Sequence, residues 1–518
     1  MTGDAESCLL NNEKGGQVNR RRLVIAAAAA LIAVGWWLCG WQLLRTREWR
    51  DEEFEFAEFG PVTKRGRILA ADGSPLAYTV RVWRFHVDPL IPERKTGFAI
   101  HYVKDVAEGL RLDELKVREA YLNKSSRYVF LADAEDGGPA HEWYVRNRSL
   151  AKRAGLIRKP VQKRVYPLGA AAAAVVGFMH GEPDLPAPPQ GAGGLEWAFD
   201  KKLSVMAAVA SAVSAAPDGS SESEPWRQQG ADIQTTLVPG VQKALAAALA
   251  AACATNGAES AFALVMKVAS GEIAAMASWP TFDPSMRRTF DKWDPEMAMN
   301  RAAQTVFEPG GLAKPIVRAI TLDCGVAADV TNAISSVGVE KFHAALRRFG
   351  FGSKTGTAGI SGEEVGILAS KPEFWEIDTT APGSVGMGHG FAATGLQVAQ
   401  AYATLANHGT LVRPVLVRGE AAAESRQIVS TNAAAAVVRM LKSPMPSTVQ
   451  MCERDSETRQ TVYSPTNFVA SCAGFHPAEK PEYVVVVSFT KPKSAHTSEE
   501  VAVPAWCGIA DQLSLQKD

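Results

Sequence analysis

An uncharged apolar run from Leu23 to Leu44 constrains this chain more than any other feature. A run of roughly 20 apolar residues spans a bilayer as a helix, because a helix satisfies its own backbone hydrogen bonds. Trp36, Trp37 and Trp41 lie towards the far end of the run, where indole rings favour the membrane interface. The arginines at positions 20–22 precede it and favour a cytoplasmic N-terminus.

The flanks of this run bear on the alternative of a cleaved signal peptide. The segment "RTREWR" after the run also carries arginines, which weakens the orientation signal. A signal peptide has a shorter apolar core and a small-x-small cleavage site, and no such site precedes "LLRTREWR". We therefore predict a cytoplasmic tail over residues 1–22, a transmembrane helix over 23–44 and an extracytoplasmic remainder.

Composition excludes some classes of protein. The chain has 518 residues and a formal net charge of zero, which gives no reason to expect a nucleic-acid partner. Its seven cysteines show no CxxC or Cys/His spacing, so neither a zinc site nor another metal or cofactor site is predicted. An oxidising compartment would permit a disulfide, for example Cys452 with Cys472, but the sequence leaves the pairing open.

Turn-forming composition divides the extracytoplasmic part. Residues Gly181–Gly194 are rich in proline and glycine and predict a loop, and residues Ser214–Gly230 predict an exposed linker. We therefore expect one domain over 45–213 and a second over 231–518.

The second domain shows both helical and strand patterns. Val241–Cys253 predicts an apolar helix, and two apolar runs around "ASGE" predict a hairpin. The β-branched run Tyr483–Val487 predicts a buried strand, and "GLQVAQAYATLAN" predicts a helix that ends by Gly409. Helices mixed with antiparallel hairpins indicate an α+β fold.

Several segments together resemble the class B penicillin-binding proteins, which are membrane-anchored D,D-transpeptidases that cross-link peptidoglycan. The segments, in chain order, are "KRGRILAADGSPLA" (64–77), "RVYPLGAAAAAVVGF" (164–178), "GLEWAFDKKL" (194–203), "GEIAAMASWPTFDP" (271–284), "NRAAQTVFEPGG" (300–311), "GFGSKTGTAGISGE" (350–363), "LQVAQAYATLANHGTLVRPVLV" (396–417) and "FHPAEKPEYVVVV" (475–487). The resemblance implies an elongated non-catalytic pedestal domain, a transpeptidase-like domain with an antiparallel sheet flanked by helices, and a bacterial inner-membrane location.

The resemblance also implies three catalytic clusters. A Ser-x-x-Lys at a helix start holds nucleophile and base one turn apart, a Ser-x-Asn assists proton transfer, and a strand-borne Lys-Thr/Ser-Gly binds the peptide carboxylate. Backbone donors form an oxyanion hole. In this chain the first cluster has Gly311 in place of the nucleophile and keeps Lys314. Glycine has no side chain to acylate, so Lys314 has nothing to activate.

The second cluster is altered as well. The segment "NAISSVG" places Ile334, Ser335 and Ser336 at the Ser-x-Asn positions, and Asn332 lies nearby. The spacing from Lys314 is shorter than in the family, which indicates a deletion. We interpret the two serines as ordinary helix-start or turn residues.

The third cluster is not found where the resemblance places it. A Lys-Thr-Gly occurs at residues 354–356, but in the family this place holds a loop before the catalytic strand. The expected place, just before "GFHPAEKPEYVVVV", corresponds to Glu453–Phe468 and contains no such motif. No catalytic cluster is intact, and Gly311, Lys314 and Ser336 mark vestigial positions.

Three hypotheses follow. The favoured one is a catalytically inactive scaffold or regulator of peptidoglycan synthesis or cell division, bound to the membrane and partnering a glycosyltransferase. The second is an active transpeptidase that binds penicillin with a relocated nucleophile such as Ser335 or Ser353. The third is a module whose cleft holds peptidoglycan stem peptides or β-lactams without covalent chemistry.

Overall fold

The structure describes most of the chain that follows residue 64. The computed structural model describes residues 65–92, 99–180, 190–204, 230–285, 294–327, 329–371, 385–419, 425–454 and 461–515. The predicted span Leu23–Leu44 and most of the predicted linker lie outside these ranges, within which no helix has the length and apolarity to cross a membrane. Residues 63–518 form one compact unit, and the domain boundaries at 213 and 231 stay predictions.

The N-terminal part is built on one long strand, β2 (Pro75–Val87). It pairs antiparallel with β3 (Val129–Glu135) on one side and β4 (Leu156–Val165) on the other. Apolar side chains of the three strands, such as Phe85 and Leu131, pack with the adjoining helices into a separate core. These helices are α3 (Val103–Leu110), α4 (Glu114–Leu122), α5 (Pro139–Arg146) and α6 (Arg148–Arg153).

Three of the segments that carry the family resemblance meet at a buried carboxylate. Glu196 is completely buried, and its two oxygens accept from Arg65 Nε and Arg164 Nε at 2.7 Å each. Arg65 also donates to Asp200 at 2.7 Å. A buried charge is costly unless it is paired, so the two arginines are what allow Glu196 to lie there.

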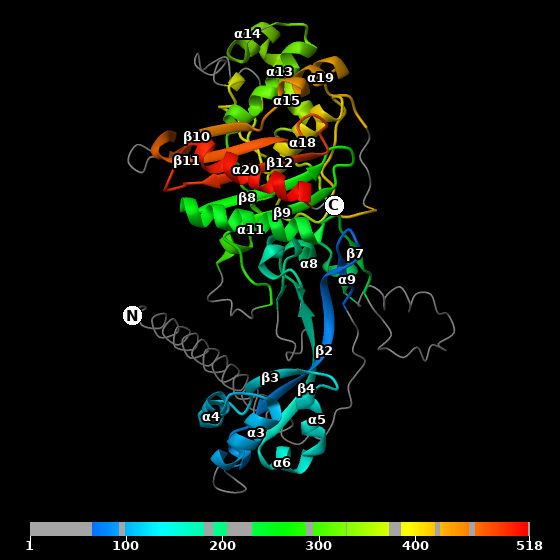
Figure 1. Ribbon diagram of the computed structural model, residues 1–518, viewed down its shortest axis with the longest axis vertical. Coiled ribbons are helices and arrows are strands. Elements are labelled where there is room, and N and C mark those ends of the chain that lie inside the picture. Colours follow the sequence, from blue (N-terminus) through cyan, green and yellow to red (C-terminus); the bar gives the residue numbers. More distant parts are fainter. Residues whose placement is uncertain are drawn as a thin grey trace, which may run out of the picture. The chain divides into compact units, whose positions relative to one another are not determined.

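The C-terminal part is built on a five-stranded antiparallel sheet (Figure 1). Its strand order is β10-β11-β12-β8-β9. The first two strands in the chain, β8 and β9, lie at one edge of the sheet, and the β10–β11 hairpin lies at the other edge. The strands are β8 (Ser260–Lys267), β9 (Ile273–Trp279), β10 (Met445–Arg454), β11 (Thr461–His476) and β12 (Tyr483–Thr490).

Both faces of this sheet are covered by helices. Successive residues of a strand point to opposite faces. Val485 and Val487 therefore pack towards α11 (Pro239–Asn256) and α20 (Ser498–Leu515), whereas Val484 and Val486 belong to the core on the other face. In Figure 1 α11 and α20 lie along one face of the sheet. A strand that is buried on both faces has a nearly continuous apolar sequence, as Tyr483–Val487 has.

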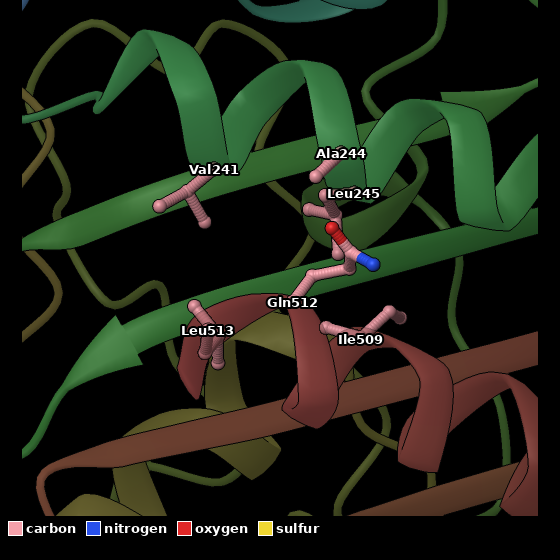
Figure 2. A pocket seen from close by; sticks show the side chains of 6 residues that line it. All are labelled: Val241, Ala244, Leu245, Ile509, Gln512 and Leu513. Atoms are coloured by element: carbon pink, nitrogen blue, oxygen red, sulfur yellow. The ribbon is translucent and has the colours of Figure 1, made fainter. Parts of the chain in front are cut away.

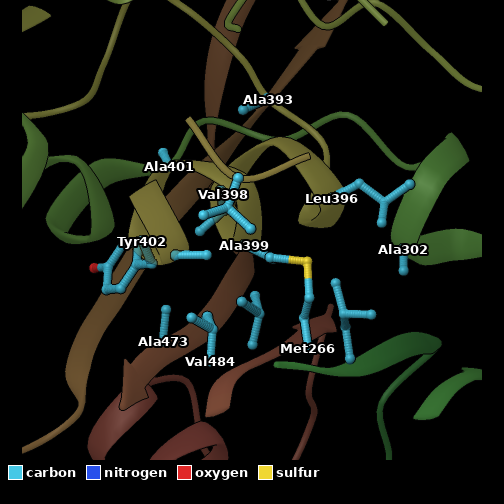
Figure 3. Packing of buried hydrophobic residues seen from close by; sticks show 14 of the residues in the cluster. Met266, Ala302, Ala393, Leu396, Val398, Ala399, Ala401, Tyr402, Ala473 and Val484 are labelled. Atoms are coloured by element: carbon cyan, nitrogen blue, oxygen red, sulfur yellow. The ribbon is translucent and has the colours of Figure 1, made fainter. Parts of the chain in front are cut away.

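The opposite face packs against α18 (Gly395–Ala406). Figure 3 shows Tyr402 and Leu396 of this helix beside Met266 and Val484 of the sheet, all in one core cluster. The helix starts at a capping box in which Thr394 accepts from the Gln397 amide and Gln397 reaches back to the Thr394 amide.

The remaining elements are short or lie around these two sheets. They are β1 (Ile68–Leu69), β5 (Met179–His180), β6 (Gln190–Gly191), β7 (Ile233–Gln234), α7 (Ala173–Val176), α8 (Gly194–Ala198), α9 (Asp200–Leu203), α12 (Arg301–Gln304), α13 (Lys314–Asp323), α14 (Ala333–Val337), α15 (Val339–Phe349), α19 (Thr431–Met440) and the 3-10 helices η1 (Ala99–Tyr102), η2 (Gly169–Ala171), η5 (Pro295–Ala298), η6 (Gly310–Ala313) and η7 (Val330–Asn332). The α+β fold is confirmed, as are the predicted helix, hairpin and strand of the second domain.

The strand register excludes the disulfide offered as an example. Cys452 stands opposite Tyr463, whereas Cys472 stands opposite Pro446. The two cysteine positions are therefore separated by about 20 Å along the hairpin, at ~3.4 Å per residue. A disulfide requires Cα atoms about 5.5–6 Å apart, so Cys452 and Cys472 cannot be bridged in this fold.

Candidate functional site

The segment "EPGGLAK" forms the expected helix start. Gly310 opens η6 with a φ of +50°, a left-handed conformation that glycine adopts readily, and its amide donates to Gly388 O at 2.9 Å. Lys314 begins α13 one turn after Gly311. The backbone frame of a nucleophile and its base is therefore present.

Gly311, the position at which the resemblance places the nucleophile, is closed by strand β10. The Gly311 amide donates to Ser447 Oγ at 2.9 Å, and the Ser447 hydroxyl donates to Pro309 O at 2.9 Å. A Cβ atom at residue 311 would lie 2.5 Å from Pro446 O, closer than real Cβ atoms come to a carbonyl oxygen. Residue 311 thus has neither a side chain nor the space for one while β10 lies where it does.

The same contact occupies a backbone donor. In acyl transfer, the amide of the nucleophilic residue commonly donates to the developing oxyanion. Here the Gly311 amide already donates to the Ser447 hydroxyl, and Ser447 is only 5% exposed. An oxyanion at this place would have to displace the Ser447 hydroxyl.

The partners expected around the nucleophile are also missing from the described residues. Lys314 Nζ has neither a hydrogen bond nor an ion pair with any residue that the structure describes. The strand that faces Gly311, Met445–Arg454, contains no lysine in its sequence. This strand therefore brings no lysine to Gly311.

The place predicted for the third cluster is wrong by one strand. We expected it at Glu453–Phe468, but the strand packed against Gly311 is β10 at Met445–Arg454. The reason is the length of β11, which spans Thr461–His476 and itself runs up to "GFHPAEK". The strand packed against Gly311 therefore comes one strand earlier in the chain than we expected.

The Lys-Thr-Gly at residues 354–356 has a different role. It lies in a loop outside the five-stranded sheet, where Thr355 donates through its amide and its hydroxyl to Glu363 Oε1, both at 2.6 Å. The Gly356 amide donates to Glu363 Oε2 at 3.2 Å. Glu363 is buried, and Lys354 is exposed. The motif therefore lies in a loop outside the sheet, as its place in the sequence predicted, and it satisfies a buried carboxylate, which the sequence did not predict.

The serines of the second cluster lie on the surface. Ser335 and Ser336 are exposed on α14, and the Ser335 hydroxyl donates to Asn332 O at 3.0 Å. Ser353 is also exposed and donates to Gly350 O at 3.4 Å. Both hydrogen bonds go to a backbone carbonyl three residues earlier in the chain. Within the described residues, neither Ser335 nor Ser353 is therefore hydrogen-bonded to a side chain that could act as its base.

Sequence reasoning missed a polar junction beside Gly311. Glu308 Oε2 lies 2.9 Å from His389 Nδ1, and Glu308 Oε1 accepts from the Gly390 amide at 3.0 Å. Tyr463 of β11 reaches the same carboxylate at 3.2 Å from each oxygen. We call Glu308, His389 and Tyr463 the carboxylate junction. The motif "EPGG" marks Glu308, but no local pattern predicts that His389 and Tyr463 contact it.

The environment of Glu308 favours its ionised form. Partial burial raises the pKa of this carboxyl, but hydrogen bonds from His389, the Gly390 amide and Tyr463 outweigh burial. The net effect is a pKa below the usual value. Glu308 is therefore a carboxylate at neutral pH.

The described cavities lie away from this cleft. Figure 2 shows a crevice between α11 and α20 that has no room for a water molecule. Its lining residues are Val241, Ala244, Leu245, Ile509, Gln512 and Leu513. An open groove of about 290 Å³ lies between α3 and α5 in the N-terminal part, beside Trp143. Within the described ranges no group of His, Cys, Asp or Glu is arranged to hold a metal ion.

The chain matches known proteins over most of its length. A family model described as the penicillin binding protein transpeptidase domain matches residues 261–336 and 328–507. The Escherichia coli K12 peptidoglycan D,D-transpeptidase FtsI is 26% identical over 498 residues, covering 83% of this chain and 80% of that protein. The Caulobacter vibrioides probable peptidoglycan D,D-transpeptidase FtsI is 26% identical over 422 residues, covering 73% of this chain and 64% of that protein.

Solved structures share the fold. Penicillin-binding protein 3 from Mycobacterium tuberculosis, crystallised with aztreonam, superimposes with a TM-score of 0.61 at 20% identity, covering 88% of this chain and 96% of that one. A peptidoglycan synthetase from Bifidobacterium adolescentis gives a TM-score of 0.59 at 16% identity, covering 88% of this chain and 95% of that one.

Proposed function

The chain belongs to the FtsI-like class B penicillin-binding proteins, and on that premise we propose that it serves peptidoglycan synthesis at cell division without catalysing transpeptidation itself. The observation that carries the proposal is the closed nucleophile position. Gly311 offers no hydroxyl, and β10 occupies the space that a side chain would need. Removing a catalytic nucleophile alone costs on the order of a millionfold in rate.

A relocated nucleophile is not supported by the geometry. Serine needs a base within hydrogen-bond reach to become nucleophilic. The recorded bonds of Ser335 and Ser353 go to backbone carbonyls of their own turns. Ser447 bonds to the Gly311 amide and Pro309 O, and it is buried.

Non-covalent binding in the cleft is not supported either. A stem peptide or β-lactam at Gly311 would have to compete with Ser447 and Pro446 for the same space. We therefore propose a scaffold role, in which the predicted membrane span and the N-terminal domain bind a peptidoglycan glycosyltransferase at the inner membrane.

Labelling with a fluorescent penicillin tests the loss of catalysis. The purified full-length chain is incubated with the label beside Escherichia coli FtsI, and denaturing electrophoresis reports the covalent adduct. We expect a labelled band for the relative only. A band from this chain that disappears in Ser335→Ala or Ser353→Ala would overturn the proposal.

Co-purification tests the scaffold role. The full chain is expressed with a peptidoglycan glycosyltransferase from the same cell and isolated from detergent by an affinity tag. We expect the polymerase to be retained by the full chain and lost from a variant that lacks residues 1–44. Equal recovery with an unrelated single-pass membrane protein would refute this part of the proposal.

A further inference from the structure

Helix α4 carries apolar side chains on two opposite faces. On the inner face Val117 and Tyr121 are buried in the core of the N-terminal part, and the Tyr121 hydroxyl donates to Ala154 O at 2.7 Å. On the outer face Leu115 and Leu122 are 63% and 64% exposed. Residues seven apart in a helix lie about 20° from each other around the axis, so the two leucines form one stripe. Single exposed leucines are ordinary, whereas an aligned pair on one helix face indicates a contact surface.

Two charged residues, Arg118 and Glu119, lie between these leucines. Both are exposed, and both project within about 60° of Leu115 around the helix axis. Neither side chain forms a hydrogen bond or an ion pair with any residue that the structure describes. Figure 1 shows α4 at the outside of the N-terminal part. Both charges are therefore available to a partner.

The order of these four residues is symmetric. The midpoint between Leu115 and Leu122 is also the midpoint between Arg118 and Glu119. When two copies of the helix lie antiparallel about this point, each Leu115 faces Leu122 of the other copy and each Arg118 faces Glu119 of the other copy. A parallel pair would instead place like charges opposite each other, and charges beside a helix contact set its orientation in this way. The outer face of α4 is therefore self-complementary, as a two-fold symmetric contact requires.

We propose that this face is a self-association surface, at which two copies of the chain pack their α4 helices antiparallel. The leucines form the apolar part of the contact, and Arg118 and Glu119 form two symmetric ion pairs across it. A helix of nine residues is only about 13 Å long, so the contact is far smaller than the ~800 Å² per partner of a stable complex. Association is therefore weak and depends on copies that are held close together in one membrane by the predicted span. Self-association of this kind does not depend on whether the chain catalyses transpeptidation.

Disulfide cross-linking of the full-length chain in membrane vesicles tests the arrangement. Two differently tagged chains, one with Leu115→Cys and the other with Leu122→Cys, are expressed together and oxidised with copper phenanthroline. We expect a disulfide-linked product that carries both tags. The natural chain, treated in the same way, reports the cross-links that its own seven cysteines form.

The single variants distinguish the antiparallel contact from a parallel one. Leu115→Cys alone should give no product above that of the natural chain, because its two copies are offset by about 10 Å along the helix axis and a disulfide needs Cα atoms about 5.5–6 Å apart. A product from Leu115→Cys alone that exceeds the mixed product would overturn the proposal. So would a mixed product no greater than that of the natural chain.

Charge variants test the ion pairs. Energy transfer between copies that carry donor and acceptor fluorescent proteins at their N-termini measures association in the same vesicles. Arg118→Glu places like charges opposite each other and should weaken association roughly tenfold. Combining Arg118→Glu with Glu119→Arg exchanges the two charges within the chain, so opposite charges face each other again and association should return to that of the natural chain. Association of the double variant no stronger than that of Arg118→Glu would contradict the pairing.

A second exposed leucine supplies the control for the stripe. Leu122→Ala should weaken association about tenfold, whereas Leu515→Ala, which removes a leucine 67% exposed at the end of α20, should leave it unchanged. Both variants should unfold at the denaturant concentration of the natural chain, since neither side chain is buried. Equal association of Leu122→Ala and Leu515→Ala would mean that the stripe binds something other than a second copy, and the proposal would fail.

Discussion

The Ser447 hydroxyl lies 2.9 Å from the Gly311 amide, and the two residues are 136 positions apart in the chain. A strand residue therefore satisfies the donor that an active relative would present to its substrate. The absence of a side chain at residue 311 and the approach of β10 are linked, because the strand occupies the space that a side chain would need.

We expect that placing a serine at residue 311 does not produce covalent labelling by penicillin. In Gly311→Ser the new Cβ would meet Pro446 O at 2.5 Å, so β10 must shift. Overpacking of this kind typically costs about 1–3 kcal/mol. We expect a lower free energy of unfolding in denaturant titrations and no covalent labelling by fluorescent penicillin.

A matched glycine supplies the control for this substitution. Gly508 lies exposed on α20, and a Cβ atom there would meet no heavy atom within 4 Å. Gly508→Ser should be neutral or stabilising by roughly 0.5 kcal/mol, since serine has the higher helix propensity. Covalent labelling of Gly311→Ser with stability equal to that of Gly508→Ser would show that the cleft is open.

Glu308 predicts a pH dependence of stability. Its pKa is lowered in the folded state, so its contribution is present above the ordinary value of 4.5 and is lost as pH falls through the folded pKa. Glu308→Gln should therefore be less stable than the natural chain at pH 7, and the difference should shrink at pH values below 4.5. Denaturant unfolding at several pH values measures this.

The exposed Glu364 is a suitable control for Glu308. Glu364→Gln removes a carboxylate from the surface of the same domain and should change stability little at any of these pH values. A constant deficit of Glu308→Gln from pH 7 to pH 3 would contradict the role assigned to the carboxylate junction.

The turn and helix start at residues 308–314 could be predicted from the sequence. The contacts that distant strands make with these residues could not. Helical spacing and the glycines of "EPGGLAK" indicate the turn and the start of α13. Ser447 and Tyr463 reach this frame from strands 136 and 155 residues beyond their partners. Contacts at such separation leave no periodic pattern.

The misplaced third cluster has a similar cause. The family resemblance implies that the third cluster precedes "GFHPAEK", but it does not give the length of the strand there. Because β11 spans 16 residues, the cleft-lining strand lies at Met445–Arg454 instead of Glu453–Phe468. Register within a hairpin is set by the turn and the facing strand, which a single segment does not reveal.

The buried carboxylate Glu196 predicts a large loss of stability on substitution. It is 0% exposed and pairs with Arg65 and Arg164 at 2.7 Å each. Glu196→Ala would leave two nearly buried guanidinium groups without this partner, and breaking such a pair typically costs about 3–5 kcal/mol. Thermal or denaturant unfolding of the full chain measures the loss.

A solvent-exposed pair nearby gives the comparison. Arg67 and Asp232 form an ion pair at 2.6 Å with side chains 52% and 28% exposed. Asp232→Asn should have a far smaller effect than Glu196→Ala, because water and salt screen the exposed pair. Equal losses in the two variants would mean that burial does not determine the importance of Glu196.

The cysteines predict which thiols react in the folded chain. Burial raises the pKa of Cys253 to about 12 and also raises the pKa of Cys472, whereas Cys324 and Cys507 are exposed. The thiolate is the reactive form, so a maleimide should modify the exposed pair quickly and the buried pair only after unfolding. A variant with serine at the other three cysteines, labelled with and without guanidinium and mapped by peptide mass, provides the test. Rapid labelling of Cys253 or Cys472 under native conditions would contradict their place in the core between the sheet and the helices α11 and α20.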